Sequence, residues 1–165
     1  MNHWALSIFS AIVMGLGATL TFDLLAMLLK YAFKITPSNI CLVGRWVRYI
    51  PEGTFKHSNI ESAPQKSGEC TVGWIAHYTI GIMFAIAFVA FAGNNWLQHP
   101  TPVPAIIYGV VTVLAPFLIL QPAFGLGFAA SKTGNPAQAR FRSLMNHTAF
   151  GVGLYFIGLL VSWLL

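Results

Sequence analysis

Asp23 has the most unusual chemical setting in the chain, because it is a carboxylate inside an otherwise uncharged apolar stretch from Ala5 to Leu29. That stretch is long enough to cross a bilayer, and an unpaired carboxylate at the centre of a membrane helix costs roughly 2.5 to 3.5 kcal/mol. Ionisable groups at such positions usually belong to proton, ion or substrate pathways. We therefore expect Asp23 to take part in a site that exchanges a proton or an ion.

Imidazole, phenol and amide side chains in the other apolar stretches would provide suitable chemistry around this carboxylate. Histidine titrates near neutral pH, and amides orient a ligand without carrying charge. Two imidazoles and a carboxylate also suit zinc or iron, although no HxxxH or HExxH spacing joins them. The residues that we expect to bind a ligand or a proton are Asp23, His77, Tyr78, Gln121, Asn146 and His147, and a metal would be held by His77, His147 and Asp23.

Composition places these residues in a membrane protein. Of the 165 residues, 56% are hydrophobic and 8% are charged, whereas soluble proteins contain about 25% charged residues. The mean hydropathy is +0.70. The apolar stretches predict an all-α integral membrane four-helix bundle that forms one domain over residues 1–165. The expected spans cover about residues 4–33, 72–91, 104–128 and 143–165.

Small side chains recur at four-residue intervals on three of these spans, on the same helical faces as the ionisable groups. Ridges of small residues let membrane helices approach closely. We therefore expect the ionisable groups to face protein and not lipid. The three ridges are Ala11-Gly15-Thr19-Asp23, Gly73-His77-Gly81-Ala85 and Ser143-His147-Gly151.

The third span is expected to have an irregular backbone. Pro116 and Pro122 remove the hydrogen bonds that would reach the carbonyls of Thr112 and Leu118. Irregular backbone at membrane depth is tolerated where it lines a cavity or contacts protein. We expect Gln121, at a depth similar to the ionisable groups, to join them in an inner polar pocket.

The nine Lys and Arg residues all lie on one predicted side of the membrane, in or beside the first and third loops. The positive-inside rule then places these loops in the cytoplasm and both termini outside. Because the basic residues lie where the topology requires them, the pI of about 9.5 does not indicate binding of nucleic acid, and we expect none. The partner that we expect is the lipid bilayer. Cys41 and Cys70 lie in the first loop, and because cytoplasmic thiols stay reduced, we expect no disulfide.

The loops differ in length. The second, residues 92–103, is short, and its Trp96 suits an anchor at the outer interface. The first, residues 34–71, is long enough to be a lid or binding element. In the first loop we expect a basic amphipathic helix at about residues 38–50, with Ser38 as its cap. This helix would lie in the headgroup layer or cover the mouth of the bundle. The alternative is that it is an inert connector between spans. The candidates for such a lid or gate are Arg45, Trp46, His57, Glu69, Arg140 and Arg142.

Several spaced motifs also resemble a known family. They are Gly44-Arg45-Trp46, Gly73-Trp74 with His77-Tyr78, Pro116-Phe117 with Gln121-Pro122, and Arg142-Ser143-Leu144 with His147 and Gly151. Together they resemble an uncharacterised family of small bacterial membrane proteins, defined by a domain of unknown function. The resemblance implies a multi-pass protein of the bacterial inner membrane, and it implies no activity or cofactor.

Two main hypotheses about function follow. The first is binding or transport of a small ligand or ion through the polar pocket, with a homodimer needed to enclose most substrates. The second is a membrane-embedded enzyme with His77 or His147 as general base, although no nucleophile motif accompanies them. A third alternative is an accessory subunit whose polar groups only hold partner helices together. Asp23 itself could also be structural, in an ion pair with Lys30, Arg140 or Arg142.

Overall fold

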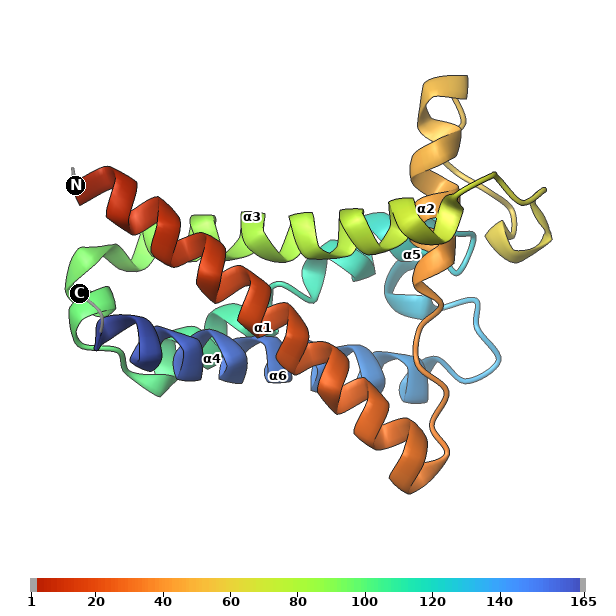
Figure 1. The fold of residues 1–165 in the computed structure, drawn as a ribbon. Helices are drawn as coiled ribbons and strands as arrows, with labels where there is room; N and C mark the ends of the chain where they lie inside the picture. Colours follow the sequence, from red (N-terminus) through yellow and green to blue (C-terminus); the bar gives the residue numbers. More distant parts are fainter. Residues whose placement is uncertain (1–2, 164–165) are drawn as a thin grey trace. The chain divides into compact units, whose positions relative to one another are not determined.

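The computed structural model describes residues 3–163, where all regular structure is helical. Four stretches are long and apolar enough to span a membrane: Trp4–Phe33, Glu69–Gln98, Pro102–Ala123 and Pro136–Ser162. The predicted all-α class and the four spans are confirmed. The elements are α1 (His3–Phe33), α2 (Ile40–Tyr49), η1 (Ile50–Glu52), η2 (Ile60–Ser62), α3 (Glu69–Gln98), α4 (Pro102–Val111), η3 (Pro116–Leu120), α5 (Gln121–Ala123), η4 (Phe128–Ala130) and α6 (Pro136–Ser162) (Figure 1).

The second span is longer than predicted, and the second loop is shorter. Gly93 breaks the helical backbone with φ 78° and ψ 172°, but α3 resumes beyond it and ends at Gln98. Trp96 was predicted to anchor the outer interface, which is wrong. Its side chain is only 6% exposed, and its indole Nε1 donates to the carbonyl of Thr101 at 3.2 Å. A glycine kink thus turns a predicted loop into helix whose tryptophan packs in the core.

The fourth span begins at Pro136, earlier than the predicted residue 143. Pro136 occupies the first helical position, and the side chain of Asn135 accepts a hydrogen bond from the backbone N–H of Gln138 at 3.1 Å. Both features are usual at helix starts. Arg140 and Arg142 therefore lie on α6 and not in a loop. Residues 164 and 165 of the predicted span lie outside the described residues.

The third span is discontinuous, as its prolines predicted. Helix α4 ends at Val111, a turn follows at residues 112–113, and the backbone then continues as the π-helical segment η3 and the short α5. The span ends at Ala123 and not at the predicted residue 128. Beyond it, Gly125 and Gly127 have φ of 88° and 75°, a left-handed conformation that ends the helix.

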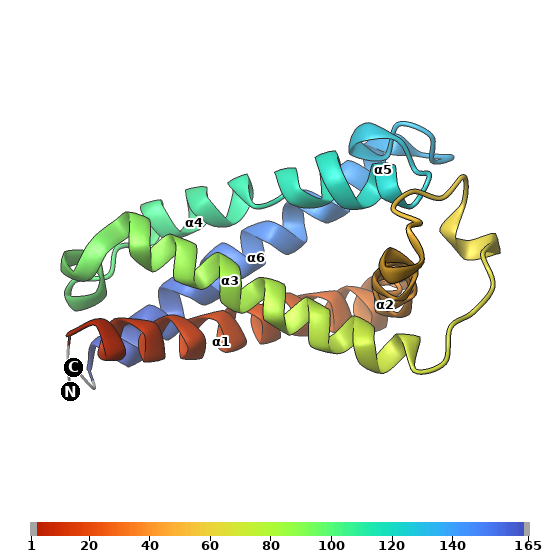
Figure 2. The same ribbon diagram turned by 90° about the horizontal axis from the view of Figure 1, so that it is seen from above.

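The described chain divides into two compact units. The first unit comprises Met1–Pro37, Tyr78–Thr112 and Met145–Leu165, and the second comprises Ser38–His77 and Val113–Leu144. In the first unit, the start of α1, the connection from α3 to α4 and the end of α6 lie at one end (Figures 1 and 2). This is the arrangement expected if both termini and the second loop share one side of a membrane.

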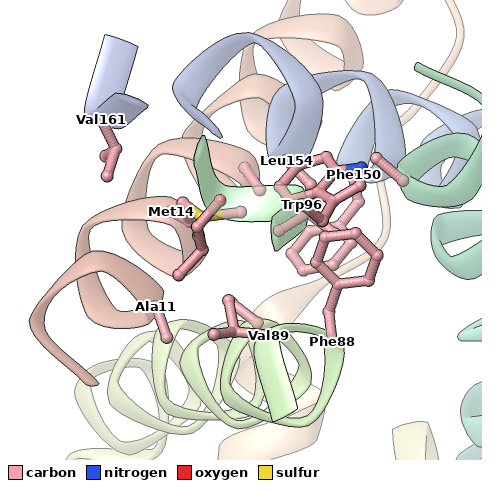
Figure 3. Close-up of a cluster of buried hydrophobic side chains, with 12 residues drawn as sticks. Ala11, Met14, Phe88, Val89, Trp96, Phe150, Leu154 and Val161 are labelled. Carbon is pink, nitrogen blue, oxygen red and sulfur yellow. The ribbon is translucent and has the colours of Figure 1, made fainter. Parts of the chain in front are cut away.

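The core of the first unit is built from apolar side chains of α1, α3, α4 and α6. Phe88 packs edge-on against Trp96 with ring centroids 4.7 Å apart, and it also contacts Tyr108 at 5.1 Å. Met14 and Leu154 are fully buried beside them (Figure 3). Many large apolar side chains on the outer faces of these helices are exposed, as expected of surfaces that face lipid.

Glycines bring the helices of the first unit together along the predicted ridges. A Cβ on Gly15 would lie 2.5 Å from the Cα of Ile82, and one on Gly81 would collide with the hydroxyl of Thr19. A Cβ on Gly151 would lie 2.7 Å from the carbonyl oxygen of Ala105. These contacts confirm that the small-residue faces of α1, α3 and α6 face other helices.

The second unit is held around a smaller apolar cluster that includes Leu42, Val43, Ile60, Ala123 and Phe124. Helix α2 crosses the start of α3 at close range, since a Cβ on Gly44 or on Gly73 would collide with backbone atoms of the other helix. The N-cap of α2 is Asn39, whose side chain accepts from the N–H of Cys41 at 3.1 Å, and not the predicted Ser38.

Cys41 and Cys70 form a disulfide between α2 and the first turn of α3, so the prediction of no disulfide is wrong. That prediction considered only the reducing compartment and not the approach of the two helices at Gly44 and Gly73. In the chain-entropy treatment, closing a loop of about 30 residues stabilises the folded state by about 3 to 4 kcal/mol.

The contact at Gly15 gives a direct test of the helix packing. We expect Gly15→Ala to destabilise the protein by about 2 kcal/mol, because the new methyl group meets backbone and not a movable side chain. The measurement is thermal unfolding in detergent, followed by circular dichroism. Gly134→Ala is the matched control, because a Cβ there has open space around it. Equal effects of the two variants would contradict the close approach.

Candidate functional site

Asp23 and Tyr78 form a polar contact between two spans of the first unit. The phenol of Tyr78, on α3, donates a hydrogen bond to Oδ2 of Asp23, on α1, at 3.0 Å. Both side chains are half-buried. The prediction that Asp23 faces protein is confirmed, and its contact is set by the helix packing, since Asp23 lies one turn beyond Thr19 on the same face.

His147 is positioned at the break in the third span. Its Nδ1 lies 2.7 Å from the hydroxyl of Thr112, the first residue after α4. Its ring also contacts Phe22 edge-on, with centroids 5.8 Å apart. Because Phe22 precedes Asp23 on α1, the carboxylate–phenol pair and the imidazole–hydroxyl pair belong to neighbouring positions of one unit.

The hydrogen bonds of Thr112 determine what His147 can do. The hydroxyl has one proton, and it donates that proton to the carbonyl of Gly109 at 2.6 Å. The contact with His147 is then satisfied when Nδ1 carries a proton and donates to the hydroxyl oxygen. In this arrangement His147 does not withdraw a proton from Thr112, so the pair lacks the geometry of an activated nucleophile.

The other predicted binding residues are distributed over both units. Asn146 is half-buried on α6 in the first unit, whereas His77 and Gln121 belong to the second. The ring of His77 contacts that of Trp74 at 5.9 Å. The amide Nε2 of Gln121 donates to Oγ of Ser143 at 3.4 Å. The predicted pocket residues are therefore not all gathered in one unit of the fold.

The described residues contain no group of three or more His, Cys, Asp or Glu side chains that could hold a metal ion. Metal binding by His77, His147 and Asp23 stays a prediction.

Arg45 and Glu69 were predicted to cover or gate the bundle, but their side chains are buried, with residue exposures of 5% and 8%. The guanidinium donates to both carboxylate oxygens of Glu69, through Nε at 2.8 Å and Nη2 at 2.7 Å. Its Nη1 donates to three backbone carbonyls, those of Ile60, Glu61 and Ala63. Hydrogen bonding to Glu69 raises the pKa of Arg45 above its ordinary value. A role of this pair in a lid or gate stays a prediction; in the fold, the pair clamps α2, η2 and α3 together.

The remaining lid candidates also contact the second unit itself. The indole of Trp46 donates to the carbonyl of Phe55 at 2.9 Å. The backbone N–H of His57 donates to the carbonyl of Ala123 at 2.8 Å. Arg140 is exposed, and its Nε donates to the carbonyl of Ala129 at 2.7 Å. Arg142 is half-buried on α6. These contacts make the long first loop an ordered part of the fold.

Two hydroxyl partners were not among the predicted site residues. Thr112 is the partner of His147, and Ser143 is the partner of Gln121. A signal for Thr112 was present in the sequence, because it lies four residues before Pro116, where a helix loses a backbone hydrogen bond. Ser143 lies on the predicted ridge with His147, but its contact with Gln121 depends on tertiary packing.

Four long apolar helices, glycine-mediated helix contacts and polar side chains within the spans define a multi-pass membrane protein. Residues 12–161 match the family model described as Protein of unknown function (DUF2938), and the chain belongs to that family. No curated protein and no solved structure matches the chain.

The Arg45–Glu69 clamp can be tested by removing one charge. We expect Glu69→Gln to lower the free energy of unfolding by about 3 kcal/mol or more, because it leaves a buried guanidinium without its counter-charge. The readout is thermal unfolding in detergent. Glu52→Gln is the control, since the ion pair between Glu52 and Lys66 is solvent-exposed on the Glu52 side and such pairs contribute about 1 kcal/mol or less. If both variants unfold alike, the clamp is not a major source of stability.

Proposed function

We propose that this protein binds and moves a small ligand or ion across the membrane, with Asp23 as the group that exchanges a proton or cation. The observation that carries the proposal is the hydrogen bond from Tyr78 to Asp23 between two membrane-spanning helices. A phenol stabilises an ionised carboxylate by donating a hydrogen bond to it. This hydrogen bond is easily displaced when the carboxylate binds a proton or cation. The half-burial of both side chains leaves the carboxylate within reach of a ligand.

The discontinuous third span supports the same proposal. Secondary transporters commonly place ligands at broken helices, where freed backbone groups and nearby polar side chains replace the hydration of the ligand. Here the break at Thr112 lies against His147, and His147 contacts Phe22 beside Asp23. A carboxylate, a phenol, an imidazole and a broken backbone in one unit suit a proton-coupled solute or a small cation. His77 and Gln121, which lie in the second unit, are not needed for this chemistry.

A membrane-embedded enzyme is a less favoured alternative. The single hydroxyl proton of Thr112 is donated to Gly109, and Ser143 accepts from Gln121. Neither contact shows a hydroxyl activated by His147. An accessory subunit, in which polar groups only hold helices together, is the alternative that the experiment on Asp23 must exclude.

The central test replaces the carboxylate. We expect Asp23→Asn to abolish protein-dependent proton entry into proteoliposomes that contain a pH-sensitive dye, while the variant remains folded in the membrane. Tyr78→Phe should reduce the entry rate partially, because the carboxylate stays but loses one hydrogen bond. Glu61→Gln is the control, since Glu61 is exposed and lies outside the spans.

Native mass spectrometry of the protein in mild detergent tests whether a ligand binds at Asp23. A co-purifying small molecule should be lost in Asp23→Asn and retained in Glu61→Gln. Proton entry and ligand retention that are unchanged in Asp23→Asn would favour the accessory subunit instead.

We further propose that the protein lies in the bacterial inner membrane with both termini outside, and that it works as a homodimer. The nine Lys and Arg residues on one side support this orientation. A second copy would help four helices to enclose a path, and exposed apolar faces are available for it.

The orientation can be measured with reporter fusions at the C-terminus. We expect a C-terminal alkaline phosphatase fusion to be active and a C-terminal green fluorescent protein fusion to be dark. A fluorescent C-terminal fusion, together with an inactive phosphatase fusion, would reverse the orientation.

A further inference from the structure

Three polar atoms in the second unit are buried and have no hydrogen-bond partner among the described residues: Nε2 of His57, Oε1 of Gln121 and Nε of Arg142. A buried polar atom without a partner costs about 1 to 3 kcal/mol, so such atoms are rare and need an explanation. A bound ligand that supplies the missing partners is one such explanation.

Backbone and side-chain contacts gather these three residues from distant parts of the sequence. The N–H of His57 donates to the carbonyl of Ala123 at 2.8 Å, two residues beyond Gln121. Gln121 in turn donates to Ser143, the residue after Arg142, at 3.4 Å. The segment from His57 to α5 and the second turn of α6 are therefore linked through Gln121.

The approach between the His57 segment and the end of the third span is unusually close. A Cβ on Gly125 would collide with backbone carbonyls of His57 and Ser58, and Gly125 has φ of 88°. A side chain would be excluded at this position by both contact and conformation. The close approach keeps His57 beside the segment that carries Gln121.

Charge indicates the kind of ligand. The guanidinium of Arg142 has no carboxylate within ion-pairing distance among residues 3–163, whereas Glu69 and Glu52 in the same unit are paired with Arg45 and Lys66. An anion would supply the counter-charge. The planar guanidinium donates well to the oxygens of a phosphate, and a protonated Nε2 of His57 would donate to another oxygen.

The amide oxygen of Gln121 adds a further requirement, because it accepts hydrogen bonds and cannot donate them. A ligand with a hydroxyl or amine near its anionic group would supply the missing donor. Phe141, which precedes Arg142 in the sequence, is 62% exposed. An exposed aromatic residue that neighbours a cation in the sequence suits the boundary between lipid headgroups and acyl chains.

We propose that Arg142, His57 and Gln121 form a binding site for a phosphate ester that carries a neighbouring hydroxyl group. Arg142 and His57 bind the phosphate oxygens, and Gln121 accepts from the hydroxyl. Both a glycerol-type anionic phospholipid headgroup and a soluble phosphate ester have this chemistry. The site lies in the second unit and does not depend on the proposed role of Asp23.

The test uses the full chain in mild detergent and three probes: short-chain phosphatidylglycerol, phosphatidylcholine of the same chain length, and glycerol 3-phosphate. Binding is measured by native mass spectrometry and by the shift in thermal unfolding temperature. We expect phosphatidylglycerol to bind and phosphatidylcholine to bind at least tenfold more weakly. Binding of glycerol 3-phosphate would identify a soluble ester as ligand, whereas its failure to bind would identify the lipid headgroup.

Variants connect this binding to the three side chains. Arg142→Gln should weaken phosphatidylglycerol binding by about tenfold or more, the effect of losing a hydrogen bond to a charged group. Arg48→Gln removes the same charge from an exposed position in the second unit and should change affinity less than about twofold. Gln121→Leu should also weaken binding, because it removes the amide oxygen that accepts from the hydroxyl group of the ligand.

Two results would overturn the proposal. The first is failure of phosphatidylglycerol and glycerol 3-phosphate to bind the wild-type protein. The second is an equal loss of affinity in Arg142→Gln and Arg48→Gln, which would indicate a general attraction between basic residues and anions. If Arg142→Gln does not fold, Arg142→Lys replaces it, because lysine keeps the charge but loses the planar fork.

Discussion

The close approach of the α1 and α3 backbones is the constraint on which the first unit depends. Apolar side chains gain little by leaving lipid for one another, so membrane helices associate through tight packing and hydrogen bonds. Gly15 and Gly81 remove the side chains that would hold these helices apart. Asp23 follows Gly15 by two turns, and Tyr78 precedes Gly81 by almost one. The carboxylate and the phenol therefore come into contact because the helices pack closely at Gly15 and Gly81. The geometry of any site at Asp23 depends on this packing.

The second unit uses a different means of cohesion. Its apolar cluster is small, and a buried Arg45, which donates to Glu69 and to three backbone carbonyls, connects α2, η2 and α3. Such a pair is stable only when every donor has a partner, because an unpaired buried charge is strongly destabilising. Arg142 differs from Arg45, because its Nε has no partner among the described residues. This difference makes Arg45 a structural cation and Arg142 a candidate for ligand binding. Two arginines of the second unit thus differ in whether their Nε atoms have a partner.

Much of the fold could be predicted, and the errors have physical causes. Long apolar stretches identified the spans, and four-residue spacing identified the buried faces, because both depend only on local helix geometry. Trp96 was misplaced because one glycine can kink a helix without ending it. The contact between Arg45 and Glu69 was not predicted, because helical periodicity cannot show that a carboxylate 24 residues away supplies the counter-charge. The disulfide was missed because compartment was considered and proximity was not.

The sequence by itself determined that the chain has four helices long and apolar enough to span a membrane, that Asp23 lies within one of them, and that the basic residues lie in or beside the first and third loops. Composition and periodicity carry this information, since the bilayer imposes length and polarity on each span separately. Only the tertiary structure decided that Tyr78 is a partner of Asp23, that Thr112 is a partner of His147, and that Gln121 belongs with Ser143 in the second unit. Partner choice depends on how helices from distant parts of the chain pack, and no local pattern records it.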